Sequence, residues 1–183
     1  SKCQSNRSMS AWKDKKMPGT NSTALTASPL TPAVIPVSHR DLLVRPVFAI
    51  LSTLMPGGQP QSSLVWVDYD GTDLLINTTL ERQKAKNMVA DPRVTVLVVD
   101  PADTSRFIEV RGRVTSISEE GATAHADKLS QRYTGKPHFY GDIYPPQRQT
   151  QETRVIVKIC PVKVTLDAFF NQPEPLSAGD TRR

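Results

Sequence analysis

The chain has 183 residues, of which 38% are hydrophobic, and its mean hydropathy is -0.37. No apolar run reaches the roughly 20 residues of a membrane-spanning helix, and the three histidines and two cysteines are too few and too scattered for a metal site. Of 23 basic and 18 acidic side chains, five basic and one acidic fall within residues 1–37, so the rest carries 18 and 17. The nearly neutral body lacks the basic surface of a nucleic-acid binder, and we expect a cytoplasmic protein with no nucleic-acid or membrane partner.

The two ends of the chain differ in composition from its middle. Residues 1–36 are rich in Ser, Thr, Pro and Lys and have almost no aromatic side chains. Such a segment buries too little apolar surface to offset the entropy lost on ordering. We therefore predict a disordered tail over residues 1–36, one domain over residues 37–170 and a second tail over residues 171–183.

The first part of the domain has the pattern of an antiparallel meander. A short helix is predicted near residues 36–43, where Ser38 can cap its start. Glycine-containing turns at Pro56-Gly57 and Asp70-Gly71 then separate apolar or alternating runs. These runs predict three strands, over residues 47–54, 61–69 and 74–78.

The second part alternates helices with long strands. A helix is predicted over residues 79–90, because Thr78 and Glu81 match a capping box and Asp91-Pro92 ends the helical pattern. A second amphipathic helix is predicted over residues 119–133. Strands are predicted over residues 93–100, 106–117 and 153–169, the last with a bulge at Pro161.

The order of these elements predicts a mainly β, α+β fold. Six strands, mostly in hairpin order, favour a closed or nearly closed antiparallel barrel with a few short peripheral helices. A parallel α/β sheet is the competing interpretation, because a helix lies between the third and fourth strands. Hairpins before and after that helix argue against a doubly wound sheet.

One stretch, NTTLERQKAKN at residues 77–87, carries three closely spaced cations. On a regular helix Arg82 and Lys86 share a face, whereas Lys84 lies about 200° away from Arg82. Charged faces of this kind are common on solvated helices. The start of a helix also favours an anion, so a phosphate clamp is the alternative. The chain has no nucleophile elbow, phosphate-binding glycine loop or metal motif, so an enzyme of this sequence would depend on a bound cofactor and would need no catalytic side chain.

The same region carries a family resemblance. The stretches GQPQSSLVWVDYDG, LLINTTLERQKAKNM, DPRVTVLVVD and SRFIEVRGRV occur in this order. They resemble the pyridoxamine 5'-phosphate oxidase-like split-barrel proteins over residues 38–168, and within them the class that uses the deazaflavin coenzyme F420. The resemblance implies a six-stranded split barrel and a homodimer with two cofactor sites at the subunit interface.

The resemblance also implies a set of cofactor-binding positions. Residues of the R-x-K-x-x-N run would hold the cofactor phosphate or polyglutamyl tail, two residues at the helix start would assist, and strand residues would line the ring system. The three positions of the run are Arg82, Lys84 and Asn87; the assisting pair is Thr79 and Gln83; the ring positions are Ser52, Thr53, Gln61, Ser105 and Phe107. Several of these residue types are equally ordinary in strands or cores.

The function implied by the resemblance is an F420-dependent oxidoreductase that transfers a hydride from reduced deazaflavin to an electron-poor organic acceptor. An FMN-dependent oxidase or reductase and a non-catalytic flavin or deazaflavin carrier are the alternatives. The loop over residues 135–150 would set the choice of acceptor.

Overall fold

The computed structural model describes residues 31–167 of the chain. The two predicted tails, at residues 1–36 and 171–183, lie mostly or wholly outside this range. The strands are β1 (Ala49–Leu54), β2 (Pro60–Val65), β3 (Val67–Tyr69), β4 (Leu74–Thr79), β5 (Arg93–Val99), β6 (Phe107–Ser118) and β7 (Arg154–Leu166). The helices are η1 (Val37–His39), α2 (Asp41–Val44), α3 (Gln83–Ala90), α4 (Ala122–Thr134), α5 (Phe139–Asp142) and η2 (Pro146–Thr150).

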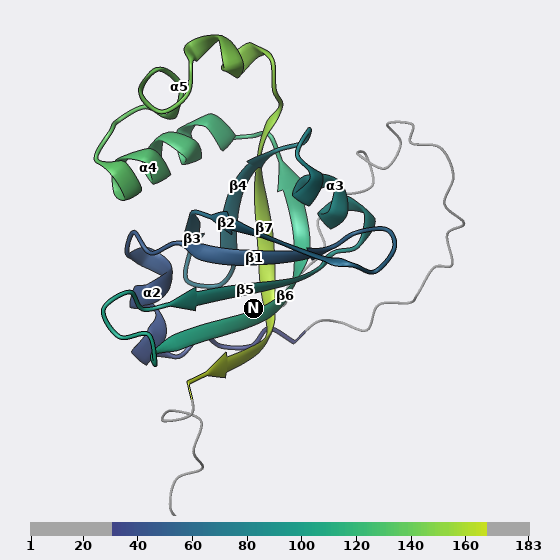
Figure 1. Cartoon of the computed structure of the whole chain (residues 1–183), viewed down its shortest axis with the longest axis vertical. Helices are drawn as coiled ribbons and strands as arrows, with labels where there is room; N and C mark the ends of the chain where they lie inside the picture. The colour runs from purple at the N-terminus through teal and green to yellow at the C-terminus, as the bar shows by residue number, and fades with distance from the viewer. Residues whose placement is uncertain (1–30, 168–183) are drawn as a thin grey trace, which may run out of the picture.

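Within residues 31–167 the strands form one antiparallel sheet that curls into a split barrel (Figure 1). Its order is β2-β1-β5-β6-β7-β4-β3, so β2 and β3 lie at opposite ends of the order. Only Trp66 separates these two strands in the chain. The sheet must therefore bend back on itself at Trp66, which confirms the predicted barrel.

The structure has seven strands rather than the six predicted, because the run at residues 61–69 turns a corner. Its first half pairs with β1, and its second half pairs with β4. Alternation of apolar and polar residues continues through a bend, so the sequence pattern does not reveal it. The predicted bulge is confirmed, because the β6–β7 register skips a residue beside Pro161.

The core fills the inside of the barrel. Alternate residues of each strand point inward and are buried, as in β1, where Ala49, Leu51 and Thr53 are buried and the residues between them are more exposed. The largest fully buried side chains include Leu51, Leu74, Ile76, Ile108 and Ile159. The folded region begins before residue 37, because Ile35 is buried and the Ala33 N–H donates to the Pro161 carbonyl at 2.9 Å.

The helix predicted over residues 79–90 begins later than expected. Strand β4 continues through Thr79, whose partner in the sheet is Arg154, and α3 begins at Gln83. The predicted capping box does not form, because the Glu81 carboxylate accepts a hydrogen bond from the Thr153 N–H at 3.0 Å. Pairing with a strand 75 residues away thus outweighs the local helix signal.

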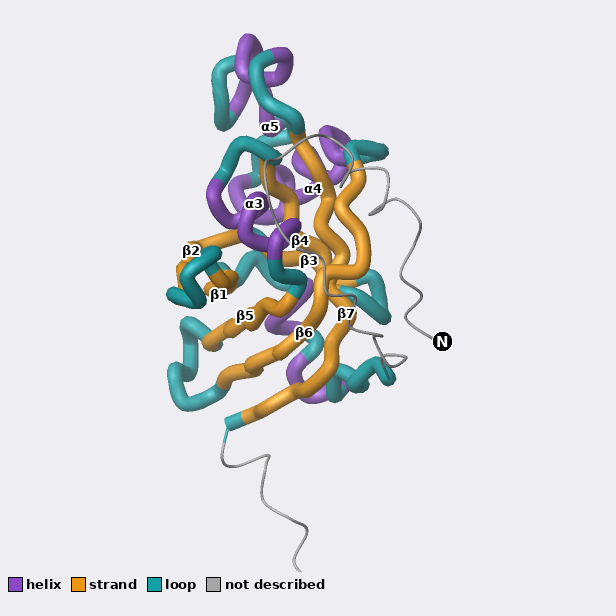
Figure 2. The backbone as a smooth tube through the Cα atoms, turned by 90° about the vertical axis from the view of Figure 1, so that its right-hand side faces the viewer, coloured by secondary structure: helices purple, strands orange, loops and turns teal. Residues whose placement is uncertain are grey.

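The helices lie outside the barrel. In Figure 1, α4 and α5 lie together at the top of the molecule, and α3 lies to one side of them. Figure 2 shows the curled sheet from the side, with β5, β6 and β7 as neighbouring strands. No helix among the described residues is long and apolar enough to span a membrane.

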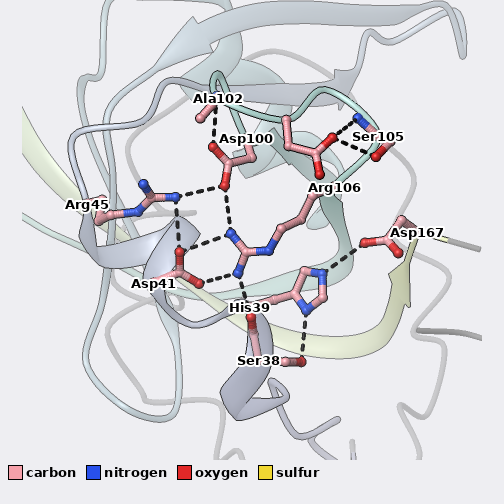
Figure 3. A network of polar contacts seen from close by, with 10 residues as sticks. Ser38, His39, Asp41, Arg45, Asp100, Ala102, Ser105, Arg106 and Asp167 are labelled. Carbon is pink, nitrogen blue, oxygen red and sulfur yellow. Dashed lines mark hydrogen bonds and ion pairs between the residues drawn. The ribbon is translucent and has the colours of Figure 1, made fainter. Parts of the chain in front are cut away.

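A polar network ties the amino-terminal segment to the barrel (Figure 3). The Arg106 guanidinium donates to both carboxylate oxygens of Asp41 in α2, at 2.6 and 3.1 Å, and to Asp100 at 2.7 Å. The buried His39 ring lies 3.1 Å from the Asp167 carboxylate at the end of β7. These contacts join α2 to the β5–β6 turn, and η1 to the residue that follows β7.

Candidate functional site

A pocket of about 170 Å³ opens between the barrel and the α4–α5 region. Its walls combine three cationic side chains, one amide and a set of large apolar groups. The lining residues are Phe48, Leu64, Val65, Trp66, Asn77, Arg82, Lys84, Leu129, Phe139, Ile143, Tyr144 and Arg154.

Two of the three cations of NTTLERQKAKN line this pocket. Arg82 is the N-cap residue of α3, with extended backbone angles, and Lys84 lies in the first turn. Because Arg82 is outside the helix, the ideal helical rotation that separates it from Lys84 does not apply. Lys86 is exposed and is not among the lining residues.

Within residues 31–167 neither Arg82 nor Lys84 forms an ion pair, and Glu152, whose pKa is lowered in part by the charge of Arg82, is paired with Arg154. Burial lowers the pKa of Lys84, and the nearby positive charge of Arg82 lowers it further. Two cations held together at the start of a helix, without a carboxylate between them, are a favourable site for an anion. A bound phosphate or carboxylate would relieve their mutual repulsion.

The third cation, Arg154, is fixed by its neighbours. Its guanidinium donates to Asn77 Oδ1 at 2.8 Å, to Glu152 Oε1 at 2.7 Å and to the Tyr140 hydroxyl at 2.8 Å. It also lies 4.2 Å from the centroid of the Phe139 ring, in cation–π geometry. Burial would raise the pKa of Glu152, but hydrogen bonds from Tyr140 and Arg154 bring it below its ordinary value.

The remaining wall of the pocket is aromatic. Trp66 stacks on Tyr133 with 5.1 Å between ring centroids, and Phe139 meets Trp66 edge-on at 6.0 Å. Phe139 also stacks on Tyr144 at 5.1 Å. A wall of this kind suits a flat conjugated ring, and the cations beside it suit an acidic substituent of that ring.

Comparison with known proteins agrees with this geometry. The sequence profile of a family described as pyridoxamine 5'-phosphate oxidase matches residues 35–166. The chain belongs to this family. A solved structure described as an F420 reductase is 34% identical, with a TM-score of 0.63 over 72% of this chain and 98% of the reductase.

More distant structures share the fold. A conserved hypothetical protein from Mycobacterium tuberculosis is 27% identical, with a TM-score of 0.55 over 81% of this chain and 96% of its own. HupZ from Group A Streptococcus, at 18% identity and a TM-score of 0.52, shares the fold over 73% of this chain and 99% of HupZ. No curated protein matches the chain. The members of the pyridoxamine 5'-phosphate oxidase family are flavin-type oxidoreductases, and this chain belongs to that group.

Four of the positions implied by the family resemblance form one hydrogen-bonded cluster. The Asn87 amide donates to Thr53 Oγ1 and to Gln61 Oε1, each at 3.0 Å, and its oxygen accepts from Gln83 at 2.8 Å. The cluster joins α3 to the β1–β2 hairpin. These side chains therefore hold the helix that carries Lys84, and the donors of Asn87 are committed within the protein.

The other implied positions lie at three different places. Thr79 is buried at the end of β4, opposite Arg154 in the sheet. Ser52 lies on the outer face of β1, where its hydroxyl is 2.8 Å from that of Ser62. Ser105 is exposed in the β5–β6 turn (Figure 3) and hydrogen-bonds to Asp103. Phe107 is the first residue of β6. None of the three sites is in the pocket lining.

The site also includes residues that pattern analysis did not single out. Arg154 opens an apolar strand, and a charge next to the run VIV is a weak signal of a buried, paired cation. Trp66 and Phe48 read as ordinary strand residues, and the structure places both in the pocket wall. Within residues 31–167, no group of three His, Cys, Asp or Glu residues could hold a metal ion.

Proposed function

We propose that the protein is an F420-dependent oxidoreductase whose pocket binds the deazaflavin and passes its hydride to an electron-poor organic acceptor. The observation that carries the proposal is the pair Arg82 and Lys84, cations that form no ion pair in the described residues, beside an aromatic wall. The relative described as an F420 reductase supports this choice of cofactor.

The residues of the pocket fit the parts of such a cofactor. Arg82 and Lys84 would bind its phosphate through charge-assisted hydrogen bonds, each contributing roughly 1.5–3 kcal/mol where water is partly excluded. Trp66 and Phe139 would pack against the ring and exclude water from it. When bound, the reduced deazaflavin supplies the hydride. The protein's part is to orient the ring and the acceptor, and no side-chain acid or base is required for that.

We further propose that the protein is a homodimer and that the second copy completes each site. Phe48 and Leu64 line the pocket and are also 57% and 67% exposed. Leu64 lies opposite Ile50 on the outer face of the sheet, and Ser52 lies one row further along the same face. A second copy packed on this face would cover its apolar side chains and bring Ser52 into the interface.

The test is a fluorescence titration with F420 and, separately, with FMN. Lys84→Ala is compared with wild type, and Lys86→Ala is the matched control, because Lys86 belongs to the same helix but not to the pocket. We expect F420 to bind at least tenfold more weakly to Lys84→Ala, a loss of about 1.4 kcal/mol, and to bind Lys86→Ala as it binds wild type.

Other outcomes separate the alternative functions. Binding of FMN alone, with the same dependence on Lys84, would indicate an FMN-dependent oxidase or reductase. Tight binding of reduced F420 without turnover of any enone or quinone would indicate a carrier. Equal effects of the Lys84 and Lys86 substitutions, or no binding of either cofactor, would refute the proposed site.

A further inference from the structure

A buried chain of polar side chains lies behind Arg154. Asn77 lines the pocket from β4, and its Oδ1 accepts a hydrogen bond from Arg154 Nη1 at 2.8 Å. Because a guanidinium can only donate, this contact fixes which end of the Asn77 amide faces Arg154. The Asn77 Nδ2 group then donates to the Ala122 carbonyl at 2.8 Å and to His125 Nδ1 at 3.2 Å.

These contacts also assign the tautomer of His125. Since Nδ1 accepts a hydrogen from Asn77, the proton of the neutral ring must be on Nε2. His125 Nε2 lies 3.4 Å from Asp68 Oδ2 and makes no hydrogen bond within residues 31–167, so its link to Asp68 is an electrostatic one. Asp68, His125, Asn77 and Arg154 thus form one continuous chain from α4 and β3 to the pocket.

The charges around His125 come from two strands, β3 and β7, and from helix α4. The Asp68 carboxylate on β3 also accepts hydrogen bonds from two side chains of α4, Lys128 Nζ at 2.5 Å and Arg132 Nη1 at 2.8 Å. Burial would raise the pKa of Asp68, but these cations and His125 together bring it well below its ordinary value. The carboxylate is therefore ionised, and its charge is already matched by two cations. On the other side of His125, beyond the Asn77 amide of β4, lies the positive charge of Arg154 on β7.

We propose that Asn77 and His125 are positioning residues that hold the Nη1 side of the Arg154 guanidinium in the pocket wall, and that protonation of His125 on Nδ1 breaks this contact, while Glu152 and Tyr140 still bind the guanidinium. A proton on Nδ1 would face the Nδ2–H group of Asn77, placing two donors against each other. The amide would have to rotate, and its NH₂ end would then face Arg154 Nη1, again donor against donor. The significance for cofactor binding rests on the proposed function, whereas the coupling between His125 and Arg154 does not.

The coupling is tested by nuclear magnetic resonance of the side-chain nitrogens, without any cofactor. In wild type at pH 7.5 we expect the Nε2–H tautomer of His125 and a resolved, slowly exchanging signal of the Arg154 Nη1–H group, which donates to Asn77. Asn77→Asp can still accept from Arg154 but requires a donor from His125, so we expect a doubly protonated ring with the Arg154 signal retained. Asn77→Leu should lose the Arg154 signal. An Nδ1–H tautomer in wild type, or an unchanged Arg154 signal in folded Asn77→Leu, would refute the proposal.

The consequence for binding is tested by titration of F420 and FMN at pH 7.5 and 5.5. We expect wild type to bind roughly fivefold or more weakly at pH 5.5, a coupling of ordinary size. His125→Phe removes the acceptor for the Asn77 Nδ2 group, so this variant should bind more weakly than wild type at pH 7.5 and lose most of the pH dependence. His138→Gln is the control, because His138 is 68% exposed and outside the chain of contacts.

The two readouts distinguish the possible failures. A pH dependence that persists in His125→Phe would contradict the role of His125 in binding. If neither cofactor binds wild type at pH 7.5, the proposed function fails, and the nitrogen spectra of wild type and the two Asn77 variants still decide whether Arg154 is positioned as proposed.

Discussion

Lys84 and Arg82 line the same pocket wall, and the pKa of Lys84 is lowered by its burial and by the charge of Arg82. An anionic cofactor binds the protonated form of Lys84. Its affinity should therefore fall as the pH rises through the lowered pKa of Lys84, below the usual lysine value of about 10.4.

In Lys84→Arg the affinity for an anionic cofactor should not fall as the pH rises, because arginine stays protonated over the whole pH range of the experiment. The measurement is the F420 dissociation constant between pH 7 and pH 10 for wild type and Lys84→Arg. Titration of the cofactor itself affects both proteins equally, so the difference between the two curves isolates Lys84. Parallel curves would show that Lys84 does not contact the anion.

The fold was predictable from sequence to the extent that it depends on local patterns. Alternation and glycine turns located nearly all the strands, and Gly135, with a left-handed φ of 76°, ends α4 close to the predicted position. The corner at Trp66 was not predictable, because a strand that bends keeps its alternation. The start of α3 was missed because Thr79 is held in the sheet by Arg154, a partner that no local window contains.

The candidate site was predictable only in part, for the same reason. Arg82 and Lys84 could be singled out as a possible anion site from their neighbours in the sequence. Whether the two side chains point into one pocket depends on where α3 begins, and that start is set by the pairing of β4 with β7. Arg154 and Phe139 reach the pocket from other elements, and their pairing is a non-local contact that periodicity cannot show.

The proposed dimer makes a prediction about Leu64, which is 67% exposed on the outer face of β2. Leu64→Arg would place a charge in the interface and should weaken self-association at least tenfold, or about 1.4 kcal/mol. Sedimentation velocity at several protein concentrations measures this. Val37→Arg is the control, because Val37 is 76% exposed on η1, away from that face. A monomeric wild type would exclude the interface.

The Arg106 network of Figure 3 predicts that replacing Arg106 by lysine lowers the stability of the fold. Both terminal nitrogens of the Arg106 guanidinium donate to the Asp41 carboxylate, and the single ammonium group of a lysine cannot reproduce this geometry. Because Asp41 is 42% exposed, solvent screening reduces the effect, and we expect Arg106→Lys to destabilise the fold by about 1 kcal/mol at pH 7. Arg93→Lys, in the exposed pair with Asp91, should cause no measurable change.

The same network predicts how the stability difference between wild type and Arg106→Lys depends on pH. The hydrogen bonds from Arg106 hold the pKa of Asp41 below its ordinary value of 3.8. A lowered folded pKa gives stability that is fully present above the unfolded value and is lost as the pH falls through the folded one. The urea-unfolding difference between wild type and Arg106→Lys should therefore be constant from pH 7 to 5 and shrink below pH 3.8. A difference that grows on acidification would assign the effect to another group.

Gly112 on β6 makes the last prediction, which concerns the close approach of β6 and β7 at the bulge. A Cβ atom at this position would lie 2.5 Å from Ile159 Cγ2 and 2.8 Å from the Cys160 carbonyl oxygen. The second contact is with the backbone of a paired strand, which cannot move without breaking the sheet. Gly112→Ala should therefore destabilise the protein by about 2 kcal/mol, as overpacking of a core does.

Gly57→Ala is the matched control, because a Cβ atom there meets nothing within 4 Å and its φ is not in the left-handed region. Removing backbone freedom from the unfolded chain should leave this variant as stable as wild type or slightly more stable. Urea midpoints at one pH compare the three proteins. Equal midpoints for the two alanine variants would mean that the strands separate at the bulge more easily than their pairing implies.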